Sequence, residues 1–137
     1  MLTEEYVREH FEFLKTADYI PFWNRIADEP SFTVTGTDSP HSGTYTTKAE
    51  IAEKAYKDIT SCLAKPMLGD IRMVLVSGEW AVVELFSYSE AKNGRPYNQE
   101  LCWVCRYLDG KIVEARVYLD SAATKRLEDE NLLKSEA

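Results

Sequence analysis

Two dipeptides, Asn93-Gly94 and Asp109-Gly110, constrain the fold of this chain more than any other sequence feature. Asn-Gly and Asp-Gly between alternating apolar runs are strong signals for a β-hairpin, because a type I′ turn needs positive φ at both central residues. Ser77-Gly78 separates two further strand-like runs, and from Met67 onward the apolar residues recur with period two. The second half of the chain therefore predicts an antiparallel meander.

The first half of the chain instead shows helical periodicity. Thr3 is a predicted N-cap of a helix that ends near Pro21, and Phe22-Trp23 indicates a short second helix. Residues 31–35 alternate like a short strand. Thr47-Lys48-Ala49-Glu50 is a capping box and opens the clearest helix of the chain. Helices followed by a meander predict an α+β domain.

Length and composition fit one globular domain. The chain has 137 residues, of which 45% are hydrophobic and 28% are charged. We expect a single domain over residues 1–137, with a core over about 3–125, a short helix after Asp120 and a polar tail over 126–137. The net charge of −7 disfavours a nucleic-acid partner. No apolar run reaches the ~20 residues of a membrane span, and residues 1–5 lack a signal-peptide pattern, so we expect a cytoplasmic protein without a membrane partner.

The three cysteines do not predict a disulfide framework or a metal site. Cys102 and Cys105 match the C-x-x-C spacing, but they lie in a predicted strand, where residues three apart point to opposite faces. His10 and His41 are the only histidines. The sequence therefore disfavours zinc, and we expect no metal.

Strand register predicts which side chains share a face of the sheet. A two-residue loop at Asp109-Gly110 places Leu108 opposite Lys111, and one at Asn93-Gly94 places Lys92 opposite Arg95. The first predicted face is aliphatic, and its members are Val83, Leu85, Cys102, Val104, Val113, Ala115, Val117 and Leu119. The second mixes aromatic and ionisable side chains, namely Glu84, Phe86, Tyr88, Tyr97, Gln99, Leu101, Trp103, Arg116, Tyr118 and Asp120.

The second predicted face has the composition of a small-molecule pocket, and the alternative is a solvated face shielded by aromatic side chains. In this register Tyr88, Gln99 and Asp120 lie side by side. The aliphatic face is more apolar than a small domain usually exposes, which predicts a two-fold dimer formed through the sheet.

Several segments resemble the SnoaL-like family. The residues that carry the resemblance are Phe22-Trp23, the turn over residues 41–45, the run over residues 93–98, Trp103, the run over residues 109–114 and Tyr118-Leu119-Asp120. It covers about residues 3–125. The resemblance implies the nuclear-transport-factor-like cone, in which three helices pack on a curved antiparallel sheet around a pocket. Such domains usually dimerise, often sheet against sheet, and their SnoaL-type cyclases use acid/base chemistry without a cofactor.

Asp120 is the first candidate catalytic residue. It resembles the aspartate near the end of the last strand that acts as general acid/base in those cyclases, and an apolar setting between Tyr88 and Tyr118 would raise its pKa. The alternative is that Asp120 is only the N-cap of the last helix. Tyr97 is a candidate donor to an enolate oxygen. His41 is a second candidate base, or else a capping residue of its turn.

The remaining site candidates are expected to line the pocket. Tyr19 and Trp23 would close it from the helical side, and the predicted sheet residues are Phe86, Tyr88, Gln99, Leu101, Trp103, Arg116 and Tyr118. Arg116 could neutralise an anionic substrate, or could instead stack on Trp103. Val34 stands where the ketosteroid isomerases carry their base, which disfavours steroid isomerisation. Epoxide hydrolysis stays a weak alternative, since Gln99 is not acidic.

The sequence therefore leaves three functions open. The first is cofactor-free isomerisation, cyclisation or dehydration of a small, largely apolar, oxygenated molecule. The second is binding of such a molecule without catalysis, and the third is a dimerisation module with a residual pocket. Fold alone does not choose among them.

Overall fold

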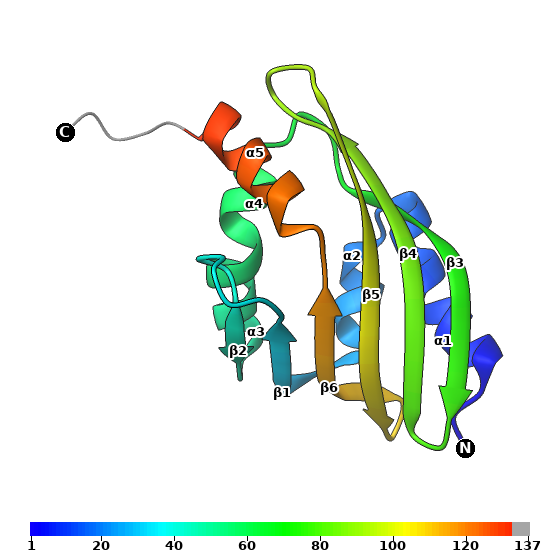
Figure 1. Cartoon of the computed structure of the whole chain (residues 1–137). Helices are drawn as coiled ribbons and strands as arrows, with labels where there is room; N and C mark the ends of the chain where they lie inside the picture. Colours follow the sequence, from blue (N-terminus) through cyan, green and yellow to red (C-terminus); the bar gives the residue numbers. More distant parts are fainter. Residues whose placement is uncertain (133–137) are drawn as a thin grey trace.

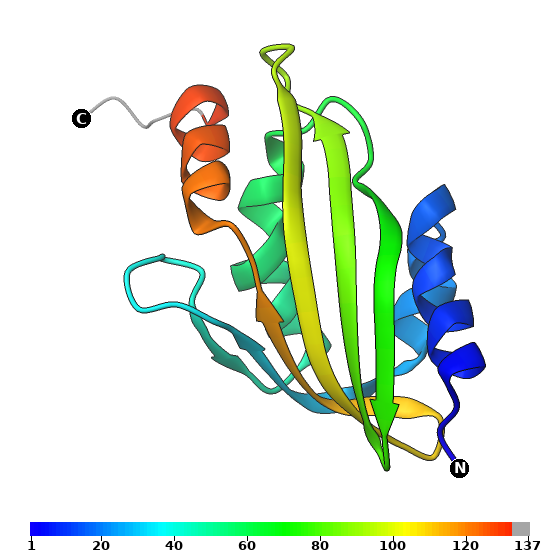
Figure 2. The same ribbon diagram turned by 45° about the vertical axis from the view of Figure 1, so that its right-hand side comes forward.

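One six-stranded sheet dominates the computed structural model, which describes residues 1–132 (Figure 1). The strand order is β2-β1-β6-β5-β4-β3. The strands are β1 (Ile26–Val34), β2 (Gly43–Tyr45), β3 (Leu68–Ser77), β4 (Trp80–Glu90), β5 (Pro96–Leu108) and β6 (Lys111–Tyr118). Figure 2 shows the strands bending along their length, so that the sheet is curved. The predicted α+β architecture is confirmed.

One strand pair departs from the expected antiparallel arrangement. β1 runs parallel to β6, whereas every other neighbouring pair is antiparallel. The parallel pair is possible because a long connection, which includes β2, the following helices and the meander, separates the two strands in sequence. The sheet is therefore mixed.

Helices form the N-terminal part, the β2–β3 connection and the end of the described chain. They are α1 (Glu4–Glu12), the 3₁₀ turn η1 (Phe13–Thr16), α2 (Tyr19–Asn24), α3 (Lys48–Glu50), the π-helical turn η2 (Ile51–Tyr56), α4 (Lys57–Ser61) and α5 (Ser121–Asn131). No helix within residues 1–132 is long and apolar enough to cross a membrane. The predicted polar tail begins inside α5, and its residues 133–137 lie outside the described part.

The predicted helix starts are confirmed by their caps. The Thr3 hydroxyl accepts a hydrogen bond from the Tyr6 N–H at 3.1 Å. The Thr47 hydroxyl accepts one from the Glu50 N–H at 3.1 Å, and the Glu50 carboxylate accepts one from the Thr46 N–H at the same distance. Each cap satisfies N–H groups that the first helical turn leaves without a partner.

The turn at Asn93-Gly94 is one residue longer than predicted, and this changes the register of the sheet. Ala91 N–H donates to the Arg95 carbonyl at 2.9 Å, so the loop contains three residues and Glu90 pairs with Pro96. The Asp109-Gly110 turn has the predicted two residues, but a bulge beyond it shifts the β5–β6 pairing as well. A one-residue slip moves every side chain of a strand to the other face.

The predicted division of the sheet into two faces was therefore wrong for β5. The face that packs against the helices, called the helix face here, carries Ala81, Val83, Leu85, Ser87, Gln99, Leu101, Trp103, Cys105, Tyr107, Ala115 and Val117. The opposite face, called the open face, carries Met73, Leu75, Trp80, Val82, Phe86, Tyr88, Cys102, Val104, Arg106, Arg116 and Tyr118. The predicted aliphatic face does not exist as one surface, since four of its eight residues are buried under the helices and Cys102 and Val104 lie on the open face.

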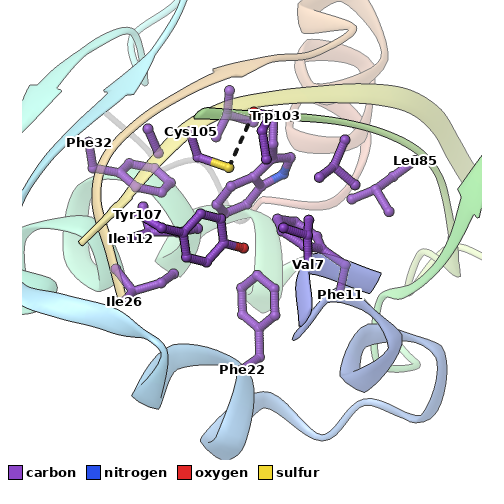
Figure 3. Close-up of a cluster of buried hydrophobic side chains, with 14 of the residues drawn as sticks. Val7, Phe11, Phe22, Ile26, Phe32, Leu85, Trp103, Cys105, Tyr107 and Ile112 are labelled. Carbon is purple, nitrogen blue, oxygen red and sulfur yellow. Dashed lines mark hydrogen bonds between the residues drawn. The ribbon is translucent and has the colours of Figure 1, made fainter. Parts of the chain in front are cut away.

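Trp103 lies at the centre of the core (Figure 3). Its indole meets the rings of Phe11, Phe22 and Phe32 edge-on, with centroids 5.4, 5.7 and 5.5 Å away. Such edge-to-face pairs add about 0.5–1.5 kcal/mol each to the free energy of burying the rings. The cluster joins α1, α2 and β1 to the middle of the sheet.

His10 ties the same elements together by hydrogen bonds. Its Nε2 lies 2.9 Å from the Phe22 carbonyl, and its Nδ1 lies 2.7 Å from the Tyr107 hydroxyl. Since a carbonyl only accepts, Nε2 carries the proton and Nδ1 accepts from Tyr107. Burial lowers the pKa of His10 to about 4, and the nearby Arg25 charge adds to this against the opposing effect of the Phe22 carbonyl. The imidazole is therefore neutral and structural.

Candidate functional site

An apolar cavity opens between α2, the α3–α4 segment and the start of β3. Its outer part has a volume of about 650 Å³, and an inner part of about 90 Å³ continues toward the core. Four side chains line both parts, and these are Tyr19, Trp23, Tyr56 and Met67. The rings of Trp23 and Tyr56 pack edge-on with centroids 5.7 Å apart. The two parts therefore form one continuous depression.

Four of the predicted ligand-binding residues line this cavity. Tyr19 and Trp23 stand at its helical side, as the sequence suggested, and Leu101 and Trp103 form part of its inner wall. The two sheet residues reach the cavity because the corrected register turns them toward the helices. Ser87 is the buried polar neighbour on the same wall.

Tyr56 is a cavity residue that the helical pattern did not predict. An α-helix with Ile51, Ala55 and Ile59 on its buried stripe would turn residue 56 away from that stripe. The π-helical turn over Ile51–Tyr56 inserts an extra residue and brings the Tyr56 side chain to the cavity. Such turns occur often at functional sites. An aromatic residue among charged ones at this position was the available sequence signal.

The Tyr56 hydroxyl and the Trp103 Nε1–H of the cavity have no partner among the described residues. The Tyr56 hydroxyl makes no hydrogen bond within residues 1–132, and burial raises its pKa, so it stays a protonated donor. The Trp103 Nε1–H is buried and finds no acceptor in the same part of the chain. Its nitrogen points to the side on which Leu85, another wall residue, lies (Figure 3). The buried Trp103 N–H without an acceptor is costly and calls for an explanation, whereas the half-buried Tyr56 hydroxyl is free to donate to a ligand.

The rim of the cavity carries two lysines. The Lys48 ammonium donates to the Trp23 carbonyl at 2.7 Å and lies 3.5 Å from the Asp28 carboxylate. The Lys65 ammonium lies 3.7 Å from the Glu90 carboxylate. Each charge is thus partly compensated, and the mouth of the cavity is polar while its walls are apolar.

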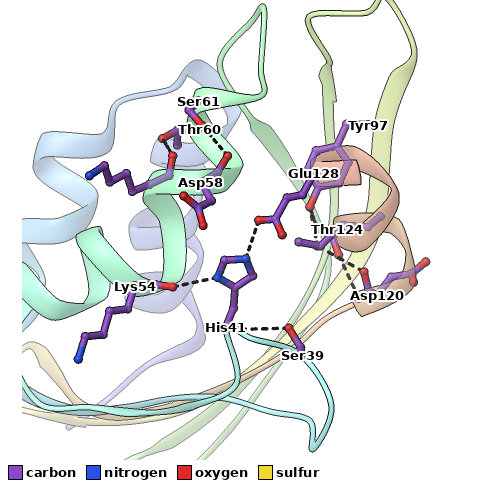
Figure 4. A network of polar contacts seen from close by, with 12 residues as sticks. Ser39, His41, Lys54, Asp58, Thr60, Ser61, Tyr97, Asp120, Thr124 and Glu128 are labelled. Carbon is purple, nitrogen blue, oxygen red and sulfur yellow. Dashed lines mark hydrogen bonds and ion pairs between the residues drawn. The ribbon is translucent and has the colours of Figure 1, made fainter. Parts of the chain in front are cut away.

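His41 takes part in a second arrangement, at the junction of the β1–β2 loop, α4 and α5 (Figure 4). Its Nδ1 lies 2.9 Å from the Lys54 carbonyl, and its Nε2 lies 2.5 Å from a Glu128 carboxylate oxygen. Burial alone would lower the pKa of His41, but the Lys54 carbonyl and the Glu128 carboxylate together raise it above its usual value. His41 does not line the apolar cavity. A groove of about 630 Å³ between this loop and α5 lies beside it.

Comparison with solved structures identifies the fold. An NTF2-like protein of unknown function from Burkholderia pseudomallei is 23% identical, with a TM-score of 0.73 over 90% of this chain and 94% of that chain. TerC, co-crystallised with polyporic acid, is 16% identical, with a TM-score of 0.72 over 91% and 96% of the two chains. A candidate isomerase from Rhodopseudomonas palustris is 16% identical, with a TM-score of 0.65 over 92% and 94%.

The chain has the NTF2-like fold. This agrees with the fold implied by the SnoaL-like resemblance. No protein-family profile matches the sequence, and no curated protein matches it. At these identities the likeness speaks for the fold alone, so the roles of individual residues depend on where they lie in this NTF2-like domain.

Tyr97 and Gln99 connect the NTF2-like sheet to α5. Gln99 Nε2 donates to the Tyr97 hydroxyl at 2.7 Å, and that hydroxyl lies 2.8 Å from the Thr124 hydroxyl. The Asp120 N–H donates to the Gln99 Oε1 at 3.0 Å. Burial raises the pKa of Tyr97 to about 12. Both side chains are buried in this chain of hydrogen bonds, outside the apolar cavity.

Asp120 is the N-cap of α5, which is the alternative to a catalytic role that the sequence left open. Its carboxylate accepts a hydrogen bond from the Ala123 N–H at 3.1 Å, and the residue is exposed. The predicted apolar setting was wrong, because Tyr88 and Tyr118 lie on the open face and Tyr88 pairs with Asn98 instead of Gln99. The general-base role of Asp120 stays a prediction.

The other predicted pocket residues lie on the open face, away from the cavity. Phe86 and Tyr88 stack on each other with centroids 6.1 Å apart. Arg116 lies over Trp80, at 5.5 Å from the ring centroid, and not over Trp103, because the register differs from the predicted one. Tyr118 is 46% exposed. The helices cover the opposite side of the sheet, so these four side chains cannot reach the same ligand as Trp23.

Proposed function

We propose that this protein binds a small, largely apolar molecule that carries oxygen, in the cavity lined by Tyr19, Trp23, Tyr56 and Met67. The observation that carries the proposal is the pair of donors without acceptors, the Tyr56 hydroxyl and the Trp103 Nε1–H, within apolar walls. A carbonyl or hydroxyl oxygen of the ligand would accept from them and would remove the cost of leaving the buried Trp103 N–H unpaired.

The size and walls of the cavity support a ligand of this class. Ligand sites usually measure ~300–1,000 Å³ and combine apolar walls with a few polar groups. The outer part, at about 650 Å³, falls within that range. TerC, a protein of similar fold, was co-crystallised with polyporic acid, which supports a small molecule as the ligand.

Binding without catalysis is favoured over acid/base chemistry. Among the described residues that line the cavity there is no carboxylate and no histidine, so no side chain there is an ordinary general base. Asp120 and His41, the predicted bases, lie outside it. Cofactor-free isomerisation, cyclisation or dehydration is the second candidate, supported by the likeness to the Rhodopseudomonas palustris candidate isomerase. A cytoplasmic location stays a prediction, consistent with three free cysteines.

Titration with polyporic acid, with isothermal calorimetry and NMR as the two readouts, tests the proposal. In the native protein we expect the ligand to shift the Met67 methyl and Trp23 indole signals. Tyr56→Phe removes one hydroxyl and should weaken binding about tenfold, since a hydrogen bond to a buried group contributes about 1.4 kcal/mol. Tyr6→Phe is the matched control, because the Tyr6 hydroxyl bonds to the Gly110 carbonyl outside the cavity.

A second variant keeps the test independent of the ligand's polar groups. Ala52 is exposed and lines the outer cavity, so Ala52→Trp should fill the cavity without disturbing the core. A panel of small aromatic ketones extends the test beyond one compound. If neither polyporic acid nor any ketone of the panel perturbs Met67, or if Ala52→Trp leaves binding unchanged, the cavity is not the ligand site.

A further inference from the structure

Three metal-ligating side chains from three different segments converge at the junction beside the cavity-forming helices. His41 comes from the β1–β2 loop, Asp58 from α4 and Glu128 from α5. One ligand atom of each lies within 4.8 Å of the other two. Figure 4 shows both carboxylates directed toward the imidazole ring. Residues so far apart in sequence meet here because α5 packs along α4.

The orientation of the histidine is that of a metal ligand. Nδ1 faces the Lys54 carbonyl at 2.9 Å and must donate to it, which leaves Nε2 directed at the carboxylates. Metal-binding histidines usually hold their second nitrogen in this way, with a carbonyl that fixes ring and tautomer. The His41 side chain is 7% exposed and that of Glu128 is 13% exposed. Two of the three ligands are thus held in place by packing.

The charges of the cluster also favour a cation. Within residues 1–132 no lysine or arginine forms an ion pair with Asp58 or Glu128, and the Asp58 carboxylate accepts no hydrogen bond there. Even with a protonated His41, two carboxylates leave one negative charge uncompensated. A divalent cation on a neutral imidazole would balance both carboxylates.

We infer that His41, Asp58 and Glu128 form a binding site for a divalent transition-metal ion. One imidazole nitrogen and two carboxylate oxygens are a ligand set suited to Zn²⁺ or a neighbouring first-row ion. Ligands at about 2.0–2.1 Å from Zn²⁺ in tetrahedral geometry are roughly 3.3 Å apart. The Glu128 oxygen, now 2.5 Å from Nε2, would move by less than about 1 Å, and Asp58 would rotate inward.

The site is separate from the proposed ligand cavity and has a different consequence. A bound ion would cross-link the β1–β2 loop, α4 and α5, and would add to the packing of α4 on α5 and to the His41–Glu128 pair. The groove beside His41 leaves room for water at the remaining coordination position. The sequence did not reveal this ligand set, because its three residues lie in separate segments that only the packing of α5 on α4 brings together.

Calorimetric titration of the full chain with Zn²⁺ tests the inference, with Mg²⁺ as comparison. We expect one Zn²⁺ per chain and weak or no Mg²⁺ binding. Asp58→Asn is the decisive variant, because the residue is exposed and its carboxylate holds no part of the fold, and it should weaken Zn²⁺ binding at least about tenfold. Glu53→Gln is the matched control, since Glu53 is an exposed acid one turn earlier that pairs with Lys57. The Glu53→Gln variant should bind Zn²⁺ as the native chain does.

NMR of the histidine rings gives a readout that is independent of affinity. Zn²⁺ should shift His41 Nε2 while the proton on Nδ1 is retained, and His10 should stay unchanged. Cys102→Ser, on the open face, should keep the binding. Absence of Zn²⁺ binding at 1 mM, equal affinity in Asp58→Asn and the native chain, or loss of binding in Cys102→Ser would each overturn the inference.

Discussion

Successive residues of each strand lie alternately on the helix face and on the open face of the sheet, so the two faces are only one residue apart in sequence. On the helix face Val83, Trp103 and Val117 form a row and are 0%, 3% and 5% exposed. One position along, Val82, Val104 and Arg116 form a row that is only half-buried. Both rows are rich in large side chains, so composition does not distinguish them. The two rows differ in that the helices cover only the first.

This difference in burial determines how a polar group on each side of the sheet is interpreted. On the covered side of the sheet, polar side chains such as His10 and Gln99 have defined partners. The buried side-chain atoms without a partner in residues 1–132 are Arg25 Nη1 and Trp103 Nε1, and of these two residues Trp103 lines the cavity. On the open face the charges pair in solvent, as Arg106 does with Glu114 at 3.7 Å. Such exposed pairs contribute little to stability. An unpartnered polar group is therefore more informative on the covered side, where solvent does not replace the missing partner.

Truncating one tryptophan on each face should give the largest contrast. Trp103→Ala removes the ring that Phe11, Phe22 and Phe32 surround and should cost about 3–5 kcal/mol of the free energy of unfolding. Trp80→Ala, on the open face, loses chiefly its contact with Arg116 and should cost about 1 kcal/mol. Urea denaturation of both variants measures the difference. Equal losses would mean that the two faces are equally buried in solution.

Acid should weaken the covered side through His10. The imidazole has a pKa of about 4 when folded and about 6.5 when unfolded, so protons bind the unfolded chain first as the pH falls. This contribution is fully present above pH 6.5 and is lost as the pH falls to about 4, with a total of about 3 kcal/mol. The groups facing the ring are the Tyr107 hydroxyl, the Phe22 carbonyl and the Arg25 charge.

Urea denaturation at pH 7 and pH 4.5, compared between the native chain and His10→Phe, isolates this effect. The variant should lose less stability on acidification than the native chain, because it has no imidazole to protonate. An equal pH dependence in both would show that His10 is not held neutral. Titration of the His10 ring signals by NMR gives the folded pKa directly.

The sequence predicted the elements of this fold well and their register poorly. Thr3 and Thr47 cap the helices they were expected to cap, and all three Gly-containing turns connect strands. Asn93-Gly94, however, occurs both in two-residue loops and in longer ones with a bulge. The dipeptide alone does not fix the loop length, and the one extra residue turned Trp103 to the helix face.

The candidate site was predictable where it depends on local pattern and not where it depends on register. Tyr19 and Trp23 lie on α2 and line the cavity independently of the strand register. Phe86 and Arg116 were assigned to the cavity only through the predicted strand register. Tyr56 was missed because a π-helical turn breaks the 3.6-residue period. The partners of His41 required the packing of α5 on α4, which no local pattern encodes.

The open face should carry the contact of a dimer, the assembly expected from the sequence although on other residues. We propose that two copies pair there, because Leu75 and Met73 are 56% and 38% exposed beside half-buried aromatic rings. Light scattering should give about twice the chain mass of 15.7 kDa. Leu75→Lys should weaken the dimer about tenfold or more, a loss of about 1.4 kcal/mol. Leu108→Lys is the control, because Leu108 is a 46% exposed leucine at the end of β5, and this variant should leave the dimer intact. A monomer at micromolar concentration would refute the pairing.

Substitutions of Asp120, the N-cap of α5, should have the smallest effect on stability. They also distinguish most clearly between a helix-capping role and a general-base role for this residue. Because its carboxylate accepts from the Ala123 N–H, Asp120→Ala should cost about 1 kcal/mol of the free energy of unfolding. Asp120→Asn should cost only a few tenths of a kcal/mol, since an asparagine side chain caps about as well. Thermal or urea denaturation of the two variants measures both numbers, and ligand titration of Asp120→Asn adds the functional half. With Asp120 exposed and outside the cavity, polyporic acid should bind Asp120→Asn as it binds the native chain. If a substrate is found and Asp120→Asn abolishes its turnover while the fold and the binding stay intact, the carboxylate acts as a base, and α5 would then have to move toward the cavity during the reaction.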